Sequence, residues 1–282
     1  MTANLENLRE WVGKSEVKSD IVNPWPVSAL AATLDEADLP VDRGSPVPNG
    51  WHWIFFLEAK RASELGADGH PKRGGFLPPV PLPRRMWAGG RLEFMRPLKI
   101  GDEITRDSEI VSVEPKTGRS GTLVFVTVRH TLKVAGAAAI VEEQDIVYRD
   151  AAQKGDAQPP GKAAPGNAAW TRRVMPDAVM LFRYSALTFN GHRIHYDMDY
   201  AVNEEHYPGL IVHGPMQATL LLDLCRHNAG RPLKKFEYRA QSPMFGGRAF
   251  TVNGNMDAAA GQADVWTAND AGNYAMRGTA TF

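Results

Sequence analysis

The chain has 282 residues, 43% hydrophobic and 23% charged, so it is long enough to bury a substantial core in one or two domains. Its 32 basic and 32 acidic residues balance, which gives no reason to expect binding to nucleic acid or to an anionic membrane surface. The single cysteine, Cys225, excludes an internal disulfide framework, and no apolar run suits a signal core or a membrane span. We therefore expect a globular cytoplasmic protein.

The first predicted element is a helix that begins near Pro26. Proline is tolerated in a first helical turn, and Val27, Leu30, Ala31 and Leu34 then follow with the spacing of one apolar helix face. We expect this helix to dock on a sheet.

Strands and a second helix follow along the chain. Stretches of β-favouring residues predict strands at 122–128, 139–148, 249–252 and 263–267. Before the last two strands, the segment after Gly214-Pro215 has almost no polar face, with apolar residues Met216, Ala218, Leu220, Leu221, Leu222, Leu224 and Cys225. A helix buried nearly all round, inside a curved antiparallel sheet, explains that composition.

Two features divide the chain into halves. Residues 151–169, AAQKGDAQPPGKAAPGNAA, lack large apolar side chains and read as a linker between domains at 1–150 and 170–282. The halves also resemble each other, because Leu92-Glu93-Phe94 is echoed by Phe236-Glu237-Tyr238 roughly 144 residues later. We predict a duplication.

Two strings carry the polar residues best suited to chemistry. They are FNGHRIHYD at 189–197 and YPGLIVHGP at 207–215, the second of which leads into the predicted buried helix. The strings would place an imidazole base near free helix amides, the groups that chemistry at a thioester carbonyl requires.

These strings belong to a longer resemblance. FRYSALTFNGHRIHYD at 182–197 is similar to the MaoC-like and type 2 hydroxyacyl-thioester dehydratases, and residues 68–79 and 84–90 resemble the N-terminal half of bacterial mesaconyl-C4-CoA (3-methylfumaryl-CoA) hydratases. The resemblance implies an α+β double hot-dog fold, with each half a curved antiparallel sheet wrapped around a central helix. It also implies a degenerate first half, since that half has no counterpart of the N-x-x-x-x-H string.

The resemblance further implies the roles of the polar residues. Related hydratases carry S-G-D-x-N-P-L-H, and alignment on the histidine places Asn190 at the aspartate, His192 at the asparagine and His195 at the histidine. An amide exchanges no proton near neutral pH, whereas imidazole titrates there. We therefore predict that His195 carries the acid–base step and that Asn190 orients the water or the thioester.

Other residues near the strings are candidates for supporting roles. Asp197 could replace the missing carboxylate or fix a histidine tautomer, and His192 and His213 could assist or merely bond the loop. Gly209 and Gly214 allow close backbone approach, and the Gly214 amide is our candidate oxyanion donor; both glycines could equally be ordinary turn residues.

A zinc site is an alternative use of the His192 and His195 pair. It would need a third ligand such as His206, His213 or Asp197. We predict no metal, because the pair falls in a loop and the chain lacks the cysteines that often complete zinc sites.

Ligand-binding residues are predicted from charge and aromaticity. For the coenzyme A phosphates we expect the basic cluster that follows the buried helix, namely Arg226, Arg231, Lys234, Lys235 and Arg239. Arg84 and Arg85 could face a second carboxylate on a C4-dicarboxylic acyl group. An acyl tunnel in the first half would be lined or supported by Trp51, Trp53, Phe55, Phe56 and Leu57, which core packing explains equally well.

The leading functional prediction is a hydratase that converts mesaconyl-C4-CoA to citramalyl-CoA, without a metal or redox cofactor and with coenzyme A only as part of the substrate. Three alternatives stay open: a 3-hydroxyacyl-thioester dehydratase of fatty acid synthesis, a hot-dog thioesterase and a non-catalytic acyl-CoA binding module. A homodimer is expected, since fused hot-dog halves often pair. The sequence leaves the acyl group, the stereochemistry and the direction of the reaction open.

Overall fold

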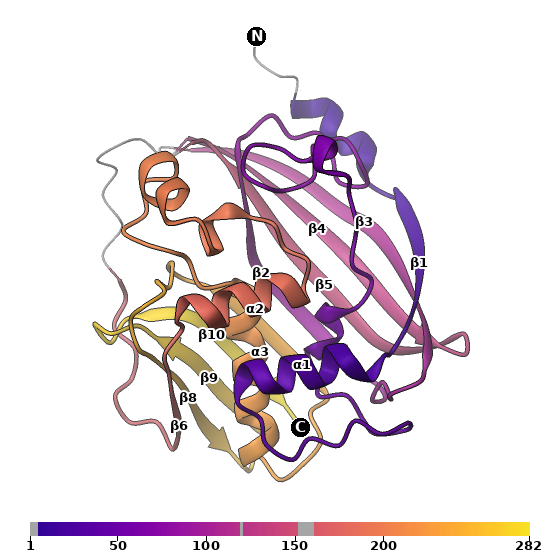
Figure 1. Ribbon diagram of the computed structural model, residues 1–282, viewed down its shortest axis with the longest axis vertical. Coiled ribbons are helices and arrows are strands. Elements are labelled where there is room, and N and C mark those ends of the chain that lie inside the picture. The colour runs from indigo at the N-terminus through magenta and orange to yellow at the C-terminus, as the bar shows by residue number, and fades with distance from the viewer. Residues whose placement is uncertain (1–4, 119–120, 152–160) are drawn as a thin grey trace.

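A computed structural model describes residues 5–118, 121–151 and 161–282. Its strands form one ten-stranded antiparallel sheet in the order β1-β3-β4-β5-β2-β7-β10-β9-β8-β6. The three α-helices lie in front of this sheet in the view of Figure 1, and their buried side chains share one hydrophobic core with the strands.

Each half of the chain supplies five strands of this sheet. The first half contributes β1 (Ser15–Ile21), β2 (Arg84–Phe94), β3 (Glu103–Gly118), β4 (Gly121–Val134) and β5 (Ala137–Arg149). The second contributes β6 (Trp170–Val174), β7 (Lys235–Ala240), β8 (Phe250–Asp257), β9 (Gln262–Ala268) and β10 (Tyr274–Thr281). The four predicted strands are confirmed, since they fall in β4, β5, β8 and β9.

The two sets of strands repeat one topology. The order β1-β3-β4-β5-β2 of the first half corresponds to β6-β8-β9-β10-β7 of the second, and β2 and β7 pair at the centre with Leu92 opposite Phe236. The internal likeness between 92–94 and 236–238 therefore marks equivalent strands. Residues 152–160 of the predicted linker lie outside the described residues, so its extent stays a prediction.

Three α-helices and several short turns connect the strands. The helices are α1 (Pro24–Leu34), α2 (Ala178–Leu187) and α3 (Gly214–Asn228), and the turns are η1 (Leu5–Trp11), η2 (Trp51–Ile54), η3 (Ala62–Glu64), η4 (Arg193–His195) and the π-turn η5 (Tyr200–Glu204). Across the described parts of the chain, no helix combines the length and apolarity needed to cross a membrane.

The first helix buries the face that its sequence predicts. Val27, Leu30, Ala31 and Leu34 of α1 are all buried. They join the core that also holds strand residues, while the helix lies directly beside α2 (Figure 1). Helix α1 therefore packs against helix α2 as well, whereas the sequence predicted that it docks only on the sheet.

Helix α3 is the centre of the second half. Every residue from Met216 to Cys225 is buried, and strands β6 to β10 of that half surround the helix. This confirms the predicted buried helix. Its polar side chains are bonded internally: Gln217 accepts the Thr267 hydroxyl at 2.8 Å, and Thr219 donates to the Pro215 carbonyl at 2.9 Å.

The first half has no long helix in the corresponding place. Between α1 and β2, residues 35–83 contain only the short turns η2 and η3. Turn η2 instead packs on α3: the Trp51 indole donates to the buried Asp223 carboxylate at 3.2 Å. A Cβ at Gly50 would come within 2.4 Å of Leu222. The prediction that each half wraps its sheet around a central helix therefore holds for the second half, whereas in the first half a short turn packs on α3 instead.

Candidate active site

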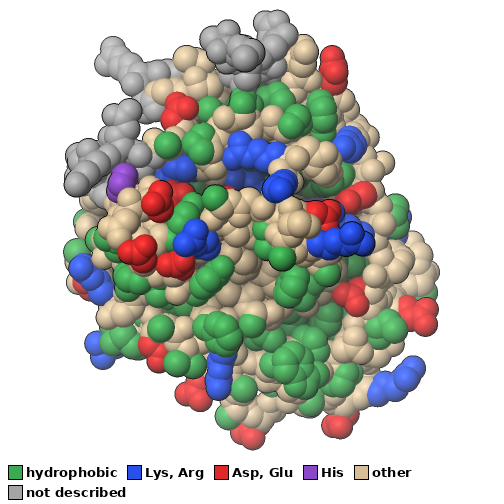
Figure 2. Space-filling view, turned by 45° about the horizontal axis from the view of Figure 1, so that its top comes forward, with side chains coloured by type: hydrophobic (Ala, Val, Ile, Leu, Met, Phe, Trp, Pro, Cys, Tyr) green, Lys and Arg blue, Asp and Glu red, His purple; other side chains and the backbone are tan. Residues whose placement is uncertain are grey.

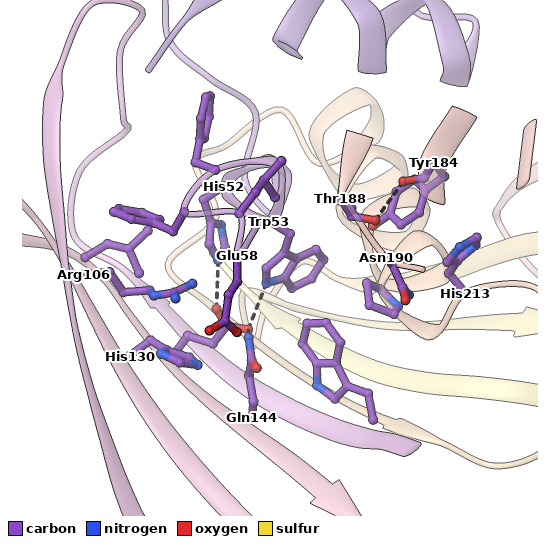
Figure 3. Close-up of a pocket in the computed structure, with 17 residues that line it drawn as sticks. His52, Trp53, Glu58, Arg106, His130, Gln144, Tyr184, Thr188, Asn190 and His213 are labelled. Atoms are coloured by element: carbon purple, nitrogen blue, oxygen red, sulfur yellow. Dashed lines mark hydrogen bonds and ion pairs between the residues drawn. The ribbon is translucent and has the colours of Figure 1, made fainter. Parts of the chain in front are cut away.

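Two adjoining cavities lie where the halves meet. The larger has a volume of about 1350 Å³ and the smaller about 260 Å³. They share lining residues from both halves, among them Trp87 and Arg106 of the first and Asn190 and Pro215 of the second. Residues of the two halves face each other across the smaller cavity in Figure 3.

One wall of the larger cavity is formed by two loops in unusually close contact. The Arg193 amide donates to the Asp68 carbonyl at 2.9 Å. Gly69 has φ +87°, and a Cβ at this residue would lie 1.9 Å from the Gly191 carbonyl oxygen. Only glycine fits here. The glycines therefore allow the first-half loop to reach the predicted catalytic string.

His195 is buried and lines the larger cavity. Its Nδ1 lies 2.7 Å from the Ile211 carbonyl oxygen. Because a carbonyl can only accept, Nδ1 carries the proton and Nε2 keeps its lone pair. Burial lowers the pKa of His195 to about 4, despite the opposing effect of the Ile211 bond. The ring is a neutral base at pH 7.

A second imidazole supports this ring. His213 stacks on His195, with ring centroids 3.7 Å apart and planes 20° apart. The His213 Nε2 pairs with the Ser185 hydroxyl at 2.8 Å, and burial holds the pKa of His213 well below its ordinary value. Protonation of both stacked rings would place two positive charges in contact. His213 therefore helps to keep His195 neutral and fixed in place.

Asn190 presents an amide donor to the cavities. Its Oδ1 accepts the His192 backbone N–H at 3.0 Å, which settles the orientation of the side-chain amide. Nδ2 is then left for the two cavities that Asn190 lines. It can donate to a water oxygen while His195 accepts a proton from the same water.

Asp68 and His70 also lie at this site, although the sequence analysis gave them no role. His70 Nδ1 pairs with the Asp68 carboxylate at 3.0 Å, and the His70 and His192 rings are 4.1 Å apart. Burial raises the pKa of Asp68, but the hydrogen bonds and charge of His70, together with the charge of His192, outweigh it and bring that pKa to about 2. Burial and the neighbouring imidazoles lower the pKa of His192 to about 2. A carboxylate therefore reaches the histidines from the first half.

The amino terminus of α3 opens at the same place. Gly214 begins the helix and lines the larger cavity, and the N-cap residue His213 makes no side-chain capping bond to the first turn. A Cβ at Gly214 would meet only the Trp87 carbonyl, at 3.9 Å. The first-turn amides are thus unfilled donors with partial positive charge beside the cavity.

Several predicted site residues lie elsewhere. Asp197 lines neither cavity, because its carboxylate pairs with Arg193 at 2.8 Å and accepts the Tyr200 amide at 3.1 Å. Gly209 is buried in the preceding loop and also lines neither cavity. A role for Asp197 as the substitute carboxylate does not fit this placement, and Asp68 stands closer to the histidines.

Arg239 of the predicted coenzyme A cluster lines the larger cavity, whereas its other members do not. Arg231, Lys234 and Lys235 follow the C-terminal end of the 15-residue helix α3, about 22 Å along its axis from the amides at Gly214. None lines a cavity, and Lys235 pairs with Glu93 at 2.7 Å. The sequence showed that these charges follow the helix but not that a straight helix carries them away from the site.

Other cations surround the larger cavity. Arg84 is already paired with Glu205 at 2.9 Å and with the Tyr207 hydroxyl, so it is not free to face a second carboxylate. Figure 2 shows Lys and Arg side chains gathered around a hollow of the surface. The basic residues that line the larger cavity include Lys72, Arg73, Arg85, Arg149, Lys162 and Arg239.

Among the described residues, the group that could hold a metal ion is not the predicted one. The donor atoms of Asp68, His70 and His192 lie within 4.8 Å of one another. His195 is outside this group, and its Nδ1 is bonded to the Ile211 carbonyl. The zinc alternative drawn from the sequence therefore does not correspond to the observed arrangement.

Most of the residues predicted to line an acyl tunnel lie at a cavity. Trp53, Phe55, Phe56 and Leu57 line the smaller cavity, whereas Trp51 is fully buried against Asp223. Figure 3 shows the first-half residues on one side of this cavity and Asn190 and His213 on the other.

Comparison with known proteins now decides the family. Residues 50–246 match the family model for hydroxyacyl-thioester dehydratase type 2. The mesaconyl-C(4)-CoA hydratase of Chloroflexus aurantiacus is 48% identical over 235 residues, which cover 83% of this chain and 84% of that protein. The chain belongs to the type 2 hydroxyacyl-thioester dehydratase family.

Solved structures agree on the fold. A MaoC-like dehydratase from Phytophthora capsici superposes with a TM-score of 0.72 at 14% identity, covering 99% of this chain and 98% of the other. A conserved hypothetical protein from Mycobacterium tuberculosis, described as a double hot-dog, gives a TM-score of 0.59 at 13% identity with 98% and 97% coverage. The α+β double hot-dog prediction is confirmed. As a member of this dehydratase family, the chain is a hydro-lyase.

Proposed function

We propose that this dehydratase-family enzyme adds water to an α,β-unsaturated C4-dicarboxylyl-CoA, namely mesaconyl-C4-CoA, and forms citramalyl-CoA. The relative that is 48% identical over most of both chains is a mesaconyl-C(4)-CoA hydratase. The observation that carries the proposal is the tautomer of His195, whose bonded Nδ1 leaves a basic Nε2 at the cavity. Coenzyme A is present only as part of the substrate, and we propose that no metal or redox cofactor takes part.

In the proposed reaction His195 moves the proton. A water held between Nε2 of His195 and Nδ2 of Asn190 loses a proton to the imidazole as its oxygen bonds to the β-carbon. The electrons of the double bond move onto the thioester carbonyl, and the α-carbon then takes back a proton from the imidazolium. This returns His195 to its neutral form.

The α3 amides stabilise the charge that develops on the thioester oxygen. The Gly214 N–H is the proposed donor, since it begins the uncapped helix beside the cavity and the helix dipole adds to its effect. The absence of a glycine side chain leaves room for the thioester. Loss of one such donor typically reduces the rate by on the order of a hundredfold or more.

His192, His213, Asp68 and His70 act on this proton transfer indirectly. The stacked His213 and the nearby His192 disfavour charging of His195 in the resting enzyme. We propose that the ionised Asp68, through His70, stabilises the cluster when the imidazolium of His195 forms. This places the carboxylate that Asn190 lacks on a loop of the other half.

The coenzyme A moiety fits the larger cavity. Its pyrophosphate and 3′-phosphate require cations, and the walls supply Arg73, Arg85 and Arg239. The acyl group would then point past Asn190 toward the smaller cavity. This arrangement keeps Arg239 and replaces the other members of the cluster after α3 as the proposed phosphate site.

The deciding experiment follows mesaconyl-C4-CoA in the purified enzyme by its enoyl absorbance and by a thiol reagent. A hydratase removes the absorbance without releasing thiol and yields citramalyl-CoA by mass spectrometry. Thiol release would instead indicate a thioesterase, and binding without turnover would indicate an acyl-CoA binding module. Turnover confined to plain 3-hydroxyacyl or enoyl thioesters would favour the dehydratase alternative. A homodimer and a cytoplasmic location remain predictions, the first testable by light scattering.

A further inference from the structure

Arg106 of β3 has no anionic partner of its own. Its guanidinium makes no hydrogen bond or ion pair with the described residues, and its buried Nε is unsatisfied. It stacks over the Phe56 ring at 5.0 Å and lines both cavities. Burial lowers the pKa of Arg106, but an arginine stays charged at neutral pH. A cation in this setting is costly unless a ligand supplies the missing charge.

The carboxylates around Arg106 are already engaged. Glu142 is buried and bonds His52 at 2.9 Å, Trp53 at 2.9 Å and Gln144 at 3.0 Å. Asp20 accepts the Phe56 amide at 2.7 Å. The remaining two, Glu58 and Glu16, pair with the lysines Lys60 and Lys18 at 3.0 Å and 3.1 Å. The contacts of this cluster therefore leave the arginine as its unpaired member.

Arg106 lies across the smaller cavity from Asn190, one of the proposed reacting groups. In Figure 3 Arg106 and His130 stand on one side of the smaller cavity, while Asn190 and His213 stand on the other. A thioester held at the start of α3 would extend a short acyl chain across this space. Its far end would meet the guanidinium.

We infer that Arg106 binds the free carboxylate of the acyl group and so selects dicarboxylyl-CoA over monocarboxylyl-CoA substrates. This inference rests on the proposed hydratase function and names a specificity residue for it. A guanidinium binds a carboxylate through two parallel hydrogen bonds, which fixes the acyl group in one orientation. The β-carbon, which bears that carboxylate in mesaconyl-C4-CoA, is thereby held against the water.

The test compares two thioesters that differ only in the anionic group. 3-Methylcrotonyl-CoA has a methyl group where mesaconyl-C4-CoA has its free carboxylate. In the wild-type enzyme we expect kcat/KM to favour the dicarboxylyl ester by on the order of a hundredfold or more. Arg106→Gln should remove most of this preference by reducing kcat/KM for mesaconyl-C4-CoA about as much, while kcat/KM for 3-methylcrotonyl-CoA changes less than about threefold.

Two further variants keep the result interpretable. Arg106→Lys preserves the charge but not the paired hydrogen bonds, so it should retain the fold and show an intermediate preference. Arg129→Gln on the neighbouring strand β4 removes a surface arginine that pairs with Glu143 at 2.8 Å, and it should leave both substrates unaffected. Melting curves report the folding of each variant.

The outcomes separate this inference from the proposed function. Equal use of both esters by the wild type would overturn the role of Arg106 while leaving the hydratase function in place. An equal loss on both esters in Arg106→Gln or Arg106→Lys would overturn it as well. If the wild type hydrates neither ester, the proposed function fails, and the inference fails with it.

Discussion

The two halves of the molecule share one strand order but differ between their first and second strands. In the second half that interval ends in α3, a long buried helix with free amides at its start. In the first half it contains α1 followed by short turns and an aromatic wall, with Trp53 and Phe56 at the smaller cavity. The comparison teaches that one sheet architecture can provide either reacting groups or substrate-binding walls, according to the segment laid across it.

The largest effect is expected from replacing His195, the proposed base in the second half. His195→Ala should reduce kcat by about a thousandfold or more, because general acid–base catalysis contributes on the order of 10² to 10⁴ and His195 is the proposed base. The measurement is steady-state hydration of mesaconyl-C4-CoA, with circular dichroism as a check of folding. The exposed His206 provides the matched control, His206→Ala, which should be fully active. Retention of a tenth of the activity by His195→Ala would contradict its role.

The contact between the halves is tested next, at Gly69. Gly69→Ala would place a methyl group 1.9 Å from the Gly191 carbonyl and must separate the two loops. Since displacement of catalytic groups by about 1 Å can cost a hundredfold, we expect kcat/KM to fall by roughly that factor.

Gly74→Ala separates this clash from backbone strain. Gly74 has the same positive φ, at +92°, but no atom lies within 4 Å of its Cβ position. Its variant should keep most of the activity. Similar losses in the two variants would mean that strain, rather than the contact between loops, matters at Gly69.

A smaller effect is expected where the first half supports α3. Trp51→Phe removes the hydrogen bond to Asp223 and leaves a buried carboxylate with one fewer donor, so the free energy of unfolding should fall by about 1–3 kcal/mol with kcat little changed. Denaturant unfolding measures this. Trp11→Phe is the control, because the buried Trp11 Nε1 has no partner to lose. Equal destabilisation by both substitutions would show that the bond across the halves contributes nothing.

The smallest change is expected between pH 7 and pH 5. The pKa of His195 is lowered to about 4 in the folded protein, below its ordinary value of 6.5, so the neutral base persists through this range. The profile of kcat/KM should be flat there and decline with a midpoint near pH 4. A midpoint near 6.5 would contradict the buried, neutral ring.

The free energy of unfolding should depend on pH through the same lowered pKa of His195. Protons bind the unfolded chain at His195 before they bind the folded one, so this group contributes stability above pH 6.5 that is lost as the pH falls through 4. His213 and His192, whose pKa values are also lowered, act with the same sign. Acid unfolding monitored by fluorescence would measure their sum.

Much of the fold was predictable from local patterns. The apolar face of α1 and the wholly apolar α3 followed from residue spacing, and the internal repeat marked β2 and β7 as equivalent. Helix α2 was missed, although Asp177 caps it by accepting the Met180 amide at 2.8 Å, a start signal visible in the sequence.

The residues of the site were predictable only where they lie within the two polar strings of the sequence. Asn190, His192, His195, His213 and Gly214 come from two adjacent strings, and the structure brings them to two adjoining cavities that share Asn190. Arg231, Lys234 and Lys235 of the predicted phosphate cluster line neither cavity, since charges that directly follow a helix lie at the opposite end from its first amides.

By itself the sequence determined the strand and helix patterns and the repeat, and it supplied His195 as the proposed base, because these follow from residue patterns within single segments. Only the tertiary structure brought Asp68 and His70 to His192, and Arg106 to the cavity that Asn190 lines. These pairs are separated by more than eighty positions in the chain. These contacts depend on the pairing of β2 with β7 and on Gly69 and Gly191, which let two loops approach closely. Local sequence patterns cannot predict contacts of this kind.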